Sequence, residues 1–522
     1  MTHRMQILGL LLILALTGCH ESNASPTFVA ATALPQLTAT AALFPTPARP
    51  SATPKPVFTP TPAYPGSYSG IPTPDPTRAG LSVHTGSDSY TVRPGDTLTG
   101  IAWAFGCTVE DLVQANGLAS ANAIWVGQRL LIPVQATLAG PAHKLIPDSE
   151  LVYGPAAIHF DLAGFVAGQG GYLSGYSEHL DGREYSGAEI VQMVAQRFSV
   201  GPRLLLALLE YQSAWVTESE PSPDTLTYPL GRIEYSRRGL YGQLEWMAAE
   251  LNAGYYAWRR EGQDTARLLD GQRVALSPGL NAGTAGVQHA LASVCDWPHW
   301  QRAVGLEGLA SVYERLFGNP FAYTVEPLVP ADLVQPEMRL PWPAGEVWYL
   351  TGGPHEGWGR GSAWAALDFV PPDMSGGCAV SQAWVTAAAA GLVLRSDTGE
   401  VIIDLDGDGY EQSGWLLCYL HIAADGRAPA GTWVHRGQRI GHPSCEGGFA
   451  DATHVHIARR FNGEWISAGM GATPLVLSGW QAVEGPRAYD GALIQGDAER
   501  LACECMLDDY NGLLSDNARP GE

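Results

Sequence analysis

Histidine and aspartate residues in the last third of the chain form a set that could hold a metal ion and do acid–base chemistry beside it. Asp368 follows His355 by thirteen residues, His421 ends an apolar run, and His454 and His456 stand two residues apart. Residues i and i+2 of a strand share a face, so we expect His454 and His456 to project together. Imidazole and carboxylate groups are common ligands of zinc, so this set of residues predicts a zinc site.

Strands must position these residues, because the surrounding pattern is β. Between residues 338 and 480, short runs of Val, Ile and Leu, such as 401–403 and 415–417, are separated by Gly, Asp and Pro. We therefore predict an all-β domain over residues 336–485, followed by a C-terminal tail over 486–522.

A further acidic motif in this region has two interpretations. Asp404, Asp406 and Asp408 alternate with other residues, as oxygen ligands do at the start of a calcium loop. Position twelve of such a loop usually carries a bidentate glutamate, and here it is Trp415. A tight acidic turn is the favoured interpretation.

The predicted β domain resembles the zinc endopeptidases of the lysostaphin and β-lytic type, which cut the peptide part of peptidoglycan. The match is best in the β-lytic and staphylolysin branch. It rests on Leu340-Pro341-Trp342, His355, Cys445-Glu446-Gly447-Gly448, His456 and Phe461-Asn462-Gly463. The commoner branch has a histidine four residues before the aspartate, where this chain has Trp364.

This resemblance implies a division of roles among the five residues. His355, Asp368 and His456 would bind zinc, and His421 and His454 would form the catalytic pair. Zinc would acidify a water and polarise the scissile carbonyl. One histidine of the pair would take the proton of the water, and the other would stabilise the oxyanion or protonate the leaving amine. The order of these two roles stays open.

Residues 146–330 show helical periodicity and predict an all-α domain. A capping box at Ser186 and Glu189 opens one helix, and an apolar run before Glu210 forms another. The run 206–215 resembles the lysozyme-like core of lytic transglycosylases, but Gln212 stands where that family has its catalytic glutamate. We expect a non-catalytic domain that spaces the others or holds glycan. A glycan-cleaving activity would require Glu210 to act as the acid.

Residues 85–135 resemble a LysM domain over its whole length. The resemblance rests on Tyr90-Thr91-Val92-Arg93-Pro94-Gly95-Asp96-Thr97, Asn116-Gly117 and Val126-Gly127-Gln128 with the apolar run that follows. It implies a β-α-α-β fold that binds glycans containing N-acetylglucosamine.

The N-terminal segment indicates export. Residues 1–18 read as a signal peptide whose apolar run is too short to span a bilayer. They end in a lipobox-like sequence before Cys19, which we expect to be lipidated and to anchor the chain. Residues 19–84 are rich in Pro, Thr and Ala and predict a disordered linker. The membrane contact would be the lipid anchor alone, facing the cell wall.

The overall composition limits the classes of partner. The formal net charge is -22, which argues against nucleic-acid binding. The chain has 8 cysteines, and export permits disulfides, with Cys378 and Cys445 as one candidate pair. We predict a multidomain cell-wall hydrolase, a zinc metalloendopeptidase that binds peptidoglycan glycan through LysM and peptide through the β domain. The alternative is a non-catalytic wall-binding scaffold that recruits or activates other hydrolases.

Overall fold

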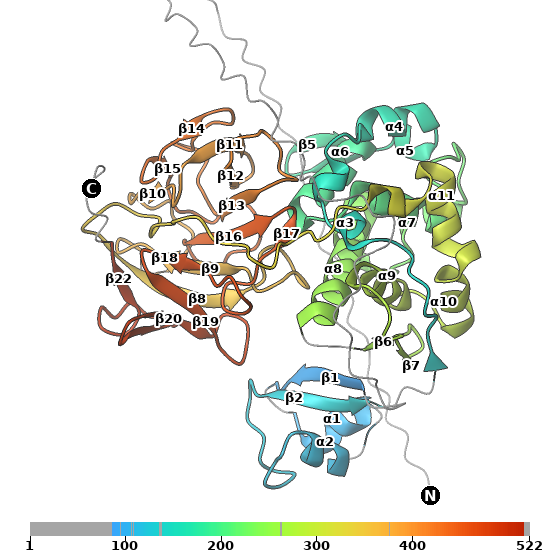
Figure 1. Cartoon of the computed structure of the whole chain (residues 1–522), viewed down its shortest axis with the longest axis horizontal. Coiled ribbons are helices and arrows are strands. Elements are labelled where there is room, and N and C mark those ends of the chain that lie inside the picture. The colour runs from blue at the N-terminus through green and yellow to red at the C-terminus, as the bar shows by residue number, and fades with distance from the viewer. Residues whose placement is uncertain are drawn as a thin grey trace, which may run out of the picture. The chain divides into compact units, whose positions relative to one another are not determined.

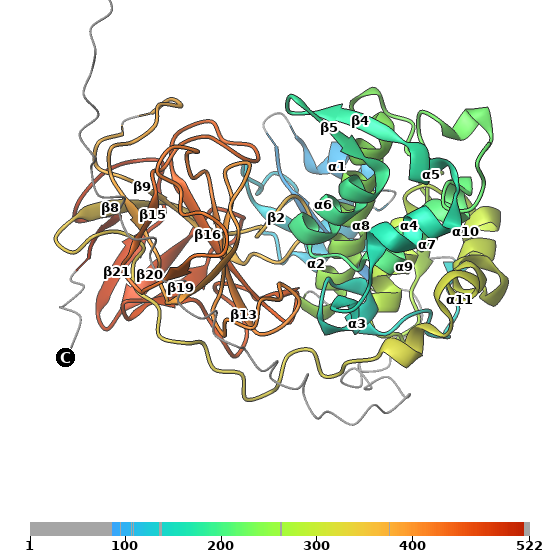
Figure 2. The same ribbon diagram turned by 90° about the horizontal axis from the view of Figure 1, so that it is seen from above.

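The computed structural model describes residues 86–93, 96–105, 107, 109–134, 138–260, 264–374 and 376–515 (Figures 1 and 2). The predicted signal peptide, Cys19 and the linker lie outside these residues. None of the helices in the described residues is long and apolar enough to cross a membrane.

Residues 86–134 form a β-α-α-β unit whose two strands pair antiparallel. Its elements are β1 (Gly86–Thr91), α1 (Leu98–Phe105), α2 (Val109–Ala115) and β2 (Arg129–Val134). Leu112, Leu130 and Ile132 are fully buried at its centre. The Asn116 side chain donates to the Leu112 carbonyl at 2.9 Å and accepts from the Leu131 backbone N–H at 2.6 Å. This amide therefore ties the end of α2 to β2.

Residues 138–323 are mostly helical, with α8 and α9 side by side (Figures 1 and 2). The helices are α3 (Asp148–Leu151), α4 (Leu162–Gln169), α5 (Tyr172–Gly175), α6 (Gly187–Phe198), α7 (Pro202–Ser213), α8 (Gly239–Arg260), α9 (Ala282–Ala292), α10 (Trp297–Ala303) and α11 (Ser311–Phe317). The predicted all-α character is incomplete, because short strands are interleaved with them. These are β3 (Leu138–Ala139), β4 (Ser177–Leu180), β5 (Arg183–Ser186), β6 (Thr265–Arg267) and β7 (Arg273–Ala275).

Local signals in the sequence explain where α6 and α7 begin. The Ser186 side chain accepts from the Glu189 backbone N–H, and the Glu189 carboxylate accepts from the Ser186 backbone N–H, so the predicted capping box is present. Pro202 stands in the first turn of α7, where its missing N–H costs nothing. Ser199 between them adopts a left-handed conformation that turns the chain back.

Among the described residues after 346, the strands form one nine-stranded antiparallel sheet and two smaller sheets. They are β8 (Val347–His355), β9 (Ala366–Val370), β10 (Val385–Thr386), β11 (Gly391–Arg395), β12 (Val401–Asp404), β13 (Trp415–Leu420), β14 (Trp433–Val434), β15 (Arg439–Gly441), β16 (Val455–Phe461), β17 (Glu464–Trp465), β18 (Val476–Leu477), β19 (Trp480–Glu484), β20 (Gly491–Gln495), β21 (Ala498–Leu501) and β22 (Gly512–Leu514). The large sheet runs β14-β11-β12-β13-β16-β9-β8-β22, and β17 pairs with β16.

The two faces of this sheet belong to different hydrophobic cores. On β16, Val455 and Ile457 join the core shared with the smaller sheets, whereas Ala458 joins the core of the helical domain. Leu416 and Cys418 of β13 likewise pack into the helical core. Side chains alternate along a strand, so His456 shares a face with Ala458. The helices therefore cover part of the same sheet face that carries the histidines.

The segment predicted as a tail, residues 486–522, is part of the β structure up to residue 515. β20 and β21 pair beside β19, in a sheet that lies next to β8 (Figures 1 and 2). β22 adds to the large sheet, where Leu513 pairs with Trp348 and is fully buried.

Candidate metal centre

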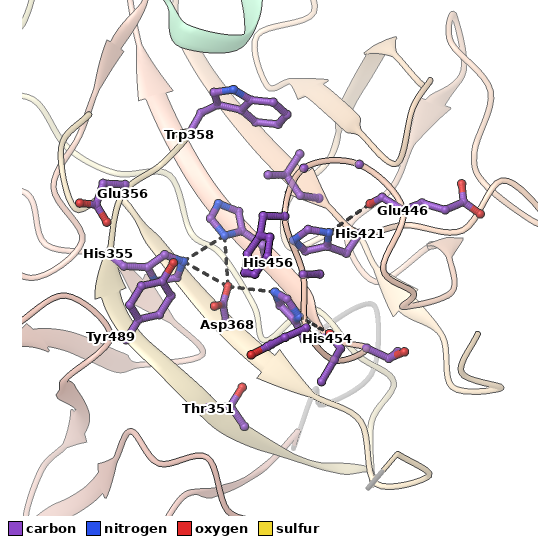
Figure 3. Close-up of a pocket in the computed structure, with 18 of the residues that line it drawn as sticks. Thr351, His355, Glu356, Trp358, Asp368, His421, Glu446, His454, His456 and Tyr489 are labelled. Carbon is purple, nitrogen blue, oxygen red and sulfur yellow. Dashed lines mark hydrogen bonds and ion pairs between the residues drawn. The ribbon is translucent and has the colours of Figure 1, made fainter. Parts of the chain in front are cut away.

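His355, Asp368 and His456 converge on one point, with all three side chains buried (Figure 3). The Asp368 Oδ1 atom lies 3.3 Å from His355 Nε2 and 3.1 Å from His456 Nδ1. The two imidazole nitrogens are 3.1 Å apart. Three zinc ligands at bond lengths of 2.0–2.1 Å in tetrahedral geometry would stand about 3.3 Å from one another. The donor spacing therefore fits a zinc ion.

The hydrogen bonds of the two imidazoles also fit a cation. His355 Nδ1 lies 2.8 Å from the Gly353 carbonyl, and His456 Nε2 lies 3.1 Å from the Gly357 carbonyl. Each carbonyl accepts the single N–H of a neutral imidazole, which leaves the other nitrogen with a lone pair. Two nitrogen lone pairs and a carboxylate oxygen then face one another and repel. A cation between them would turn this repulsion into attraction.

His421 and His454 stand beside this group as a second pair, with ring centroids 4.4 Å apart. His421 Nδ1 donates to the Glu446 carbonyl at 3.1 Å, and His454 Nδ1 donates to the Ala452 carbonyl at 2.8 Å (Figure 3). Both Nε2 atoms are thereby left as acceptors. His454 Nε2 lies 3.7 Å from Asp368 Oδ1, so this pair adjoins the carboxylate.

The pKa shifts of the site residues differ in direction. Burial would lower the pKa of His355, but the charge of Asp368 and its hydrogen bond outweigh burial and raise that pKa above its usual value. Burial lowers the pKa of His421 to about 3, and the neighbouring His454 and His456 contribute to this shift. Burial also lowers the pKa of His456. Burial would raise the pKa of Asp368, but His355 and His454 outweigh it and hold that pKa well below its usual value. Metal binding requires an ionised carboxylate and neutral imidazoles, so the lowered pKa values of Asp368 and His456 favour it, whereas the raised pKa of His355 means that a metal ion must displace a proton there at low pH.

Strand register explains why residues so far apart in sequence meet. On β16, His456 pairs with Asp368 of β9 on one side and with Leu420 of β13 on the other. His421 therefore follows directly beside it. A register shift in β8 between Gly352 and His355 redirects the end of that strand. Asp368 stands opposite Gly352, where a Cβ would come 2.7 Å from Asp368 Oδ2.

The loop before β16 is held to the end of β13. His421 has a left-handed φ of 62°, and its carbonyl accepts from the Ser444 backbone N–H at 2.7 Å. Ser444 also forms a bridge with His454. Cys378 and Cys445 form a disulfide, the candidate pair of the sequence. These contacts fix His421 and His454 side by side.

All five residues line one cavity of about 1420 Å³. The cavity is also lined by the helical domain, through Asp181 of the β4–β5 turn, Arg197 and Phe198 of α6, and Tyr241 and Glu245 of α8. It is large enough for an extended peptide. The structure thus brings together the five residues predicted from the sequence, and Cys19 alone lies outside the described residues.

Tyr489 is a site residue that the sequence did not reveal. Its ring stacks on His355 with centroids 4.1 Å apart and lines the cavity (Figure 3). Burial, together with the charges of Asp368 and Glu356, raises the pKa of Tyr489 to about 12, so its hydroxyl stays protonated. It lies in the segment predicted as a tail, where no motif marks it.

Two other candidates of the sequence are Glu210 and the acidic turn of Asp404, Asp406 and Asp408. Glu210 accepts from the backbone N–H groups of Val216 and Thr217, both at 3.1 Å, and pairs with Arg315 at 3.0 Å. It therefore organises the loop after α7. Asp404 accepts from three backbone N–H groups of its own turn, those of Asp406, Gly407 and Gly409. Ligand atoms of Asp404, Asp406 and Asp408 lie within 4.8 Å of one another, and Trp415 at position twelve packs on Phe461.

Comparisons with protein families agree with this organisation. Residues 144–330 match the model of the LasA N-terminal domain, and residues 90–133 match the LysM domain. The chain is 27% identical over 337 residues to protease LasA of Pseudomonas aeruginosa, covering 61% of this chain and 74% of LasA. It is 40% identical over 78 residues to N-acetylmuramoyl-L-alanine amidase XlyA of Bacillus subtilis, covering 15% of this chain and 26% of the amidase.

Two solved structures also show similarity to this chain. The M23 metalloprotease pseudoalterin is 24% identical, covers 34% of this chain and 97% of its own, and gives a TM-score of 0.27. Lysostaphin from Staphylococcus simulans is 18% identical, covers 27% of this chain and 63% of its own, and gives a TM-score of 0.16. The predicted resemblance to a LysM-containing peptidoglycan endopeptidase of the lysostaphin and β-lytic type is confirmed by the matches to protease LasA, to its N-terminal domain and to LysM.

Proposed function

We propose that this protein is a zinc-dependent endopeptidase that cleaves peptide bonds in peptidoglycan. One observation carries the proposal. The ligand atoms of His355, Asp368 and His456 lie at the mutual distances expected around one zinc ion, and His421 and His454 stand beside them in the same cavity. The similarity to protease LasA supports peptide-bond cleavage, and the LysM match together with the similarity to N-acetylmuramoyl-L-alanine amidase XlyA supports the cell wall as the target.

The roles of the residues follow from their free nitrogen and oxygen atoms. His355 Nε2, Asp368 Oδ1 and His456 Nδ1 would hold the ion. When bound, zinc supplies a Lewis acid that acidifies water and polarises a carbonyl. The Nε2 atoms of His421 and His454 then share two tasks. One accepts the proton of the attacking water, and the other, once its Nε2 atom is protonated, donates to the oxyanion or to the leaving amine.

The LysM domain and the N-terminal segment extend the proposal to location. LysM would hold the glycan strands and so raise the local concentration of their peptides. Export and a lipid anchor at Cys19 would place the enzyme at the membrane face of the wall. The apolar run and lipobox-like sequence before Cys19 support this part of the proposal.

Histidine variants of the full chain separate metal binding from catalysis. His456→Ala removes a ligand, so we expect loss of both stoichiometric zinc and hydrolysis of purified peptidoglycan. His421→Ala should keep zinc and lose hydrolysis. Zinc is measured by elemental mass spectrometry, and hydrolysis by mass analysis of released fragments.

The exposed His435, which lies outside the cavity, provides the control for the same substitution. His435→Ala should keep both zinc and activity. Full hydrolysis by His456→Ala or His421→Ala would refute the assignment. Wild-type protein that binds the wall, yet neither binds zinc nor hydrolyses peptidoglycan, would point to the scaffold instead.

A further inference from the structure

The loop of residues 356–362, which we call the Gly357 loop, links the metal centre to the helical domain. It begins directly after the ligand His355. Its Gly357 carbonyl accepts the Nε2–H of His456 at 3.1 Å. This bond leaves His456 Nδ1 facing Asp368 and His355. The position of one backbone carbonyl therefore sets which nitrogen of His456 is available to a metal.

The Gly357 loop is closed on itself. The Gly357 N–H donates to the Ala363 carbonyl at 3.0 Å. The Trp358 N–H donates to the Ser362 hydroxyl oxygen at 3.1 Å. A displacement at the tip of the loop must therefore be transmitted to Gly357.

The tip of the loop rests on the helical domain. Gly361 has a φ of +92°, and a Cβ there would stand 2.4 Å from the Ala249 carbonyl oxygen of α8. Next to it, the Arg360 guanidinium pairs with the Glu250 carboxylate, also on α8. Only a glycine permits this close approach of the loop backbone to the helix.

The other side of the loop is also fixed to α8, through β17. A Cβ on Gly357 would stand 2.5 Å from the Trp465 ring. The Trp465 backbone N–H donates to the Tyr256 hydroxyl oxygen at 2.9 Å, and its indole N–H to the Phe198 carbonyl at 3.3 Å. The Gly357 loop is thus held between α8 and a strand that α6 and α8 themselves position.

We infer that the helical domain positions the metal ligand His456, by clamping the Gly357 loop against α8. On this account, Gly361 and Glu250 are positioning residues, although neither touches the metal or the substrate. The inference rests on the proposed zinc site. If this inference is right, the helical domain contributes to the geometry of the metal centre, in addition to spacing the other domains or holding glycan.

Two alanine variants of glycine in the full chain test this clamp. Gly361→Ala places a methyl group against the Ala249 carbonyl and pushes the loop away. Gly345→Ala introduces a Cβ at a similar φ of +86° with nothing within 4 Å, so it controls for backbone strain alone. We expect the zinc dissociation constant of Gly361→Ala to rise about 10–100-fold, the usual effect of losing an outer ligand partner. Gly345→Ala should stay within about twofold of wild type.

The dissociation constants are measured by competition with a chromophoric chelator. The visible spectrum of the Co²⁺-substituted protein gives a second readout of ligand geometry. Should Gly361→Ala fail to fold, Glu250→Gln replaces it, with Glu337→Gln as control. Glu337 pairs with Arg436 at 2.6 Å and is 74% exposed, and neither residue lines the cavity, so its loss should not affect zinc.

The outcomes separate the clamp from the zinc site itself. Absence of stoichiometric zinc in wild-type protein would overturn the proposed function, and the clamp with it. Zinc bound by wild type, with equal affinity and an equal Co²⁺ spectrum in Gly361→Ala and Gly345→Ala, would overturn the clamp alone. A Gly361→Ala variant that loses thermal stability without any change in zinc affinity would also overturn the clamp.

Discussion

Removal of one charge from the network between the helical domain and the sheet should cost much of the stability of the protein. Glu400 is only 1% exposed and accepts from Arg197 Nε of α6 at 2.8 Å. It also pairs with Arg395, which contacts Glu411 at 2.6 Å. Glu411 in turn pairs with Arg460 of β16 at 3.4 Å. The perturbation is Glu400→Gln, which keeps the shape and removes the charge.

The expected size of the effect follows from these contacts. Breaking a buried ion pair by removing one partner costs about 3–5 kcal/mol, because the other charge stays buried. Here Arg395 keeps Glu411, and the glutamine oxygen still accepts one hydrogen bond from Arg197. We therefore expect the lower end, a loss of about 3 kcal/mol in the free energy of unfolding.

Urea unfolding followed by tryptophan fluorescence measures this loss, with the m-value as a check that the same surface unfolds. Glu337→Gln is the matched control, since Glu337 pairs with Arg436 at 2.6 Å but is 74% exposed. An exposed pair contributes about 0–1 kcal/mol. A Glu400→Gln loss no larger than that of the control would refute the reasoning that the network is buried and fixes the helices on the sheet.

Two further perturbations test structural roles. Glu210→Gln should lower the free energy of unfolding by about 1–3 kcal/mol, because the two backbone N–H groups lose a charged acceptor. If the variant instead keeps the wild-type urea midpoint and releases fewer glycan fragments from the wall, this structural role is wrong. Replacing Cys378 and Cys445 together by serine opens a loop with a sequence separation of 67 residues, for which chain entropy gives about 4 kcal/mol. We expect a lower urea midpoint than that of the wild type, both measured without reductant so that the Cys503–Cys505 disulfide stays in place. An unchanged midpoint would show that the Cys378–Cys445 disulfide contributes nothing.

The sequence predicted the parts of the site that depend on local spacing. His454 and His456 stand two residues apart, and both face Asp368, as the period of a strand requires. The pairing of His456 with Asp368 depends on β9 lying next to β16, which no local pattern encodes. That pairing came from the family resemblance, and the roles of the five residues stay predictions.

The elements that the sequence missed are short or lack a pattern. β22 has only 3 residues, too few to show alternation, although Leu513 is buried in the sheet. The β4–β5 hairpin has strands of 4 residues beside the clear helical signal of α6. Tyr489 meets His355 only through the turn before β20, so its position depends on tertiary packing.

One signal of the two-domain arrangement was nevertheless present in the sequence. An antiparallel strand with one solvated face alternates apolar and polar residues, whereas a strand covered on both faces is apolar throughout. β13 reads Trp-Leu-Leu-Cys-Tyr-Leu, and all six residues are buried. Leu417 and Tyr419 enter the core of the sheets, and Leu416 and Cys418 enter the helical core. The unbroken apolar run therefore indicates a cover on the second face. His456 lies on that same face of the neighbouring strand. The packing of the helices on this face and the placement of the metal ligands therefore depend on each other.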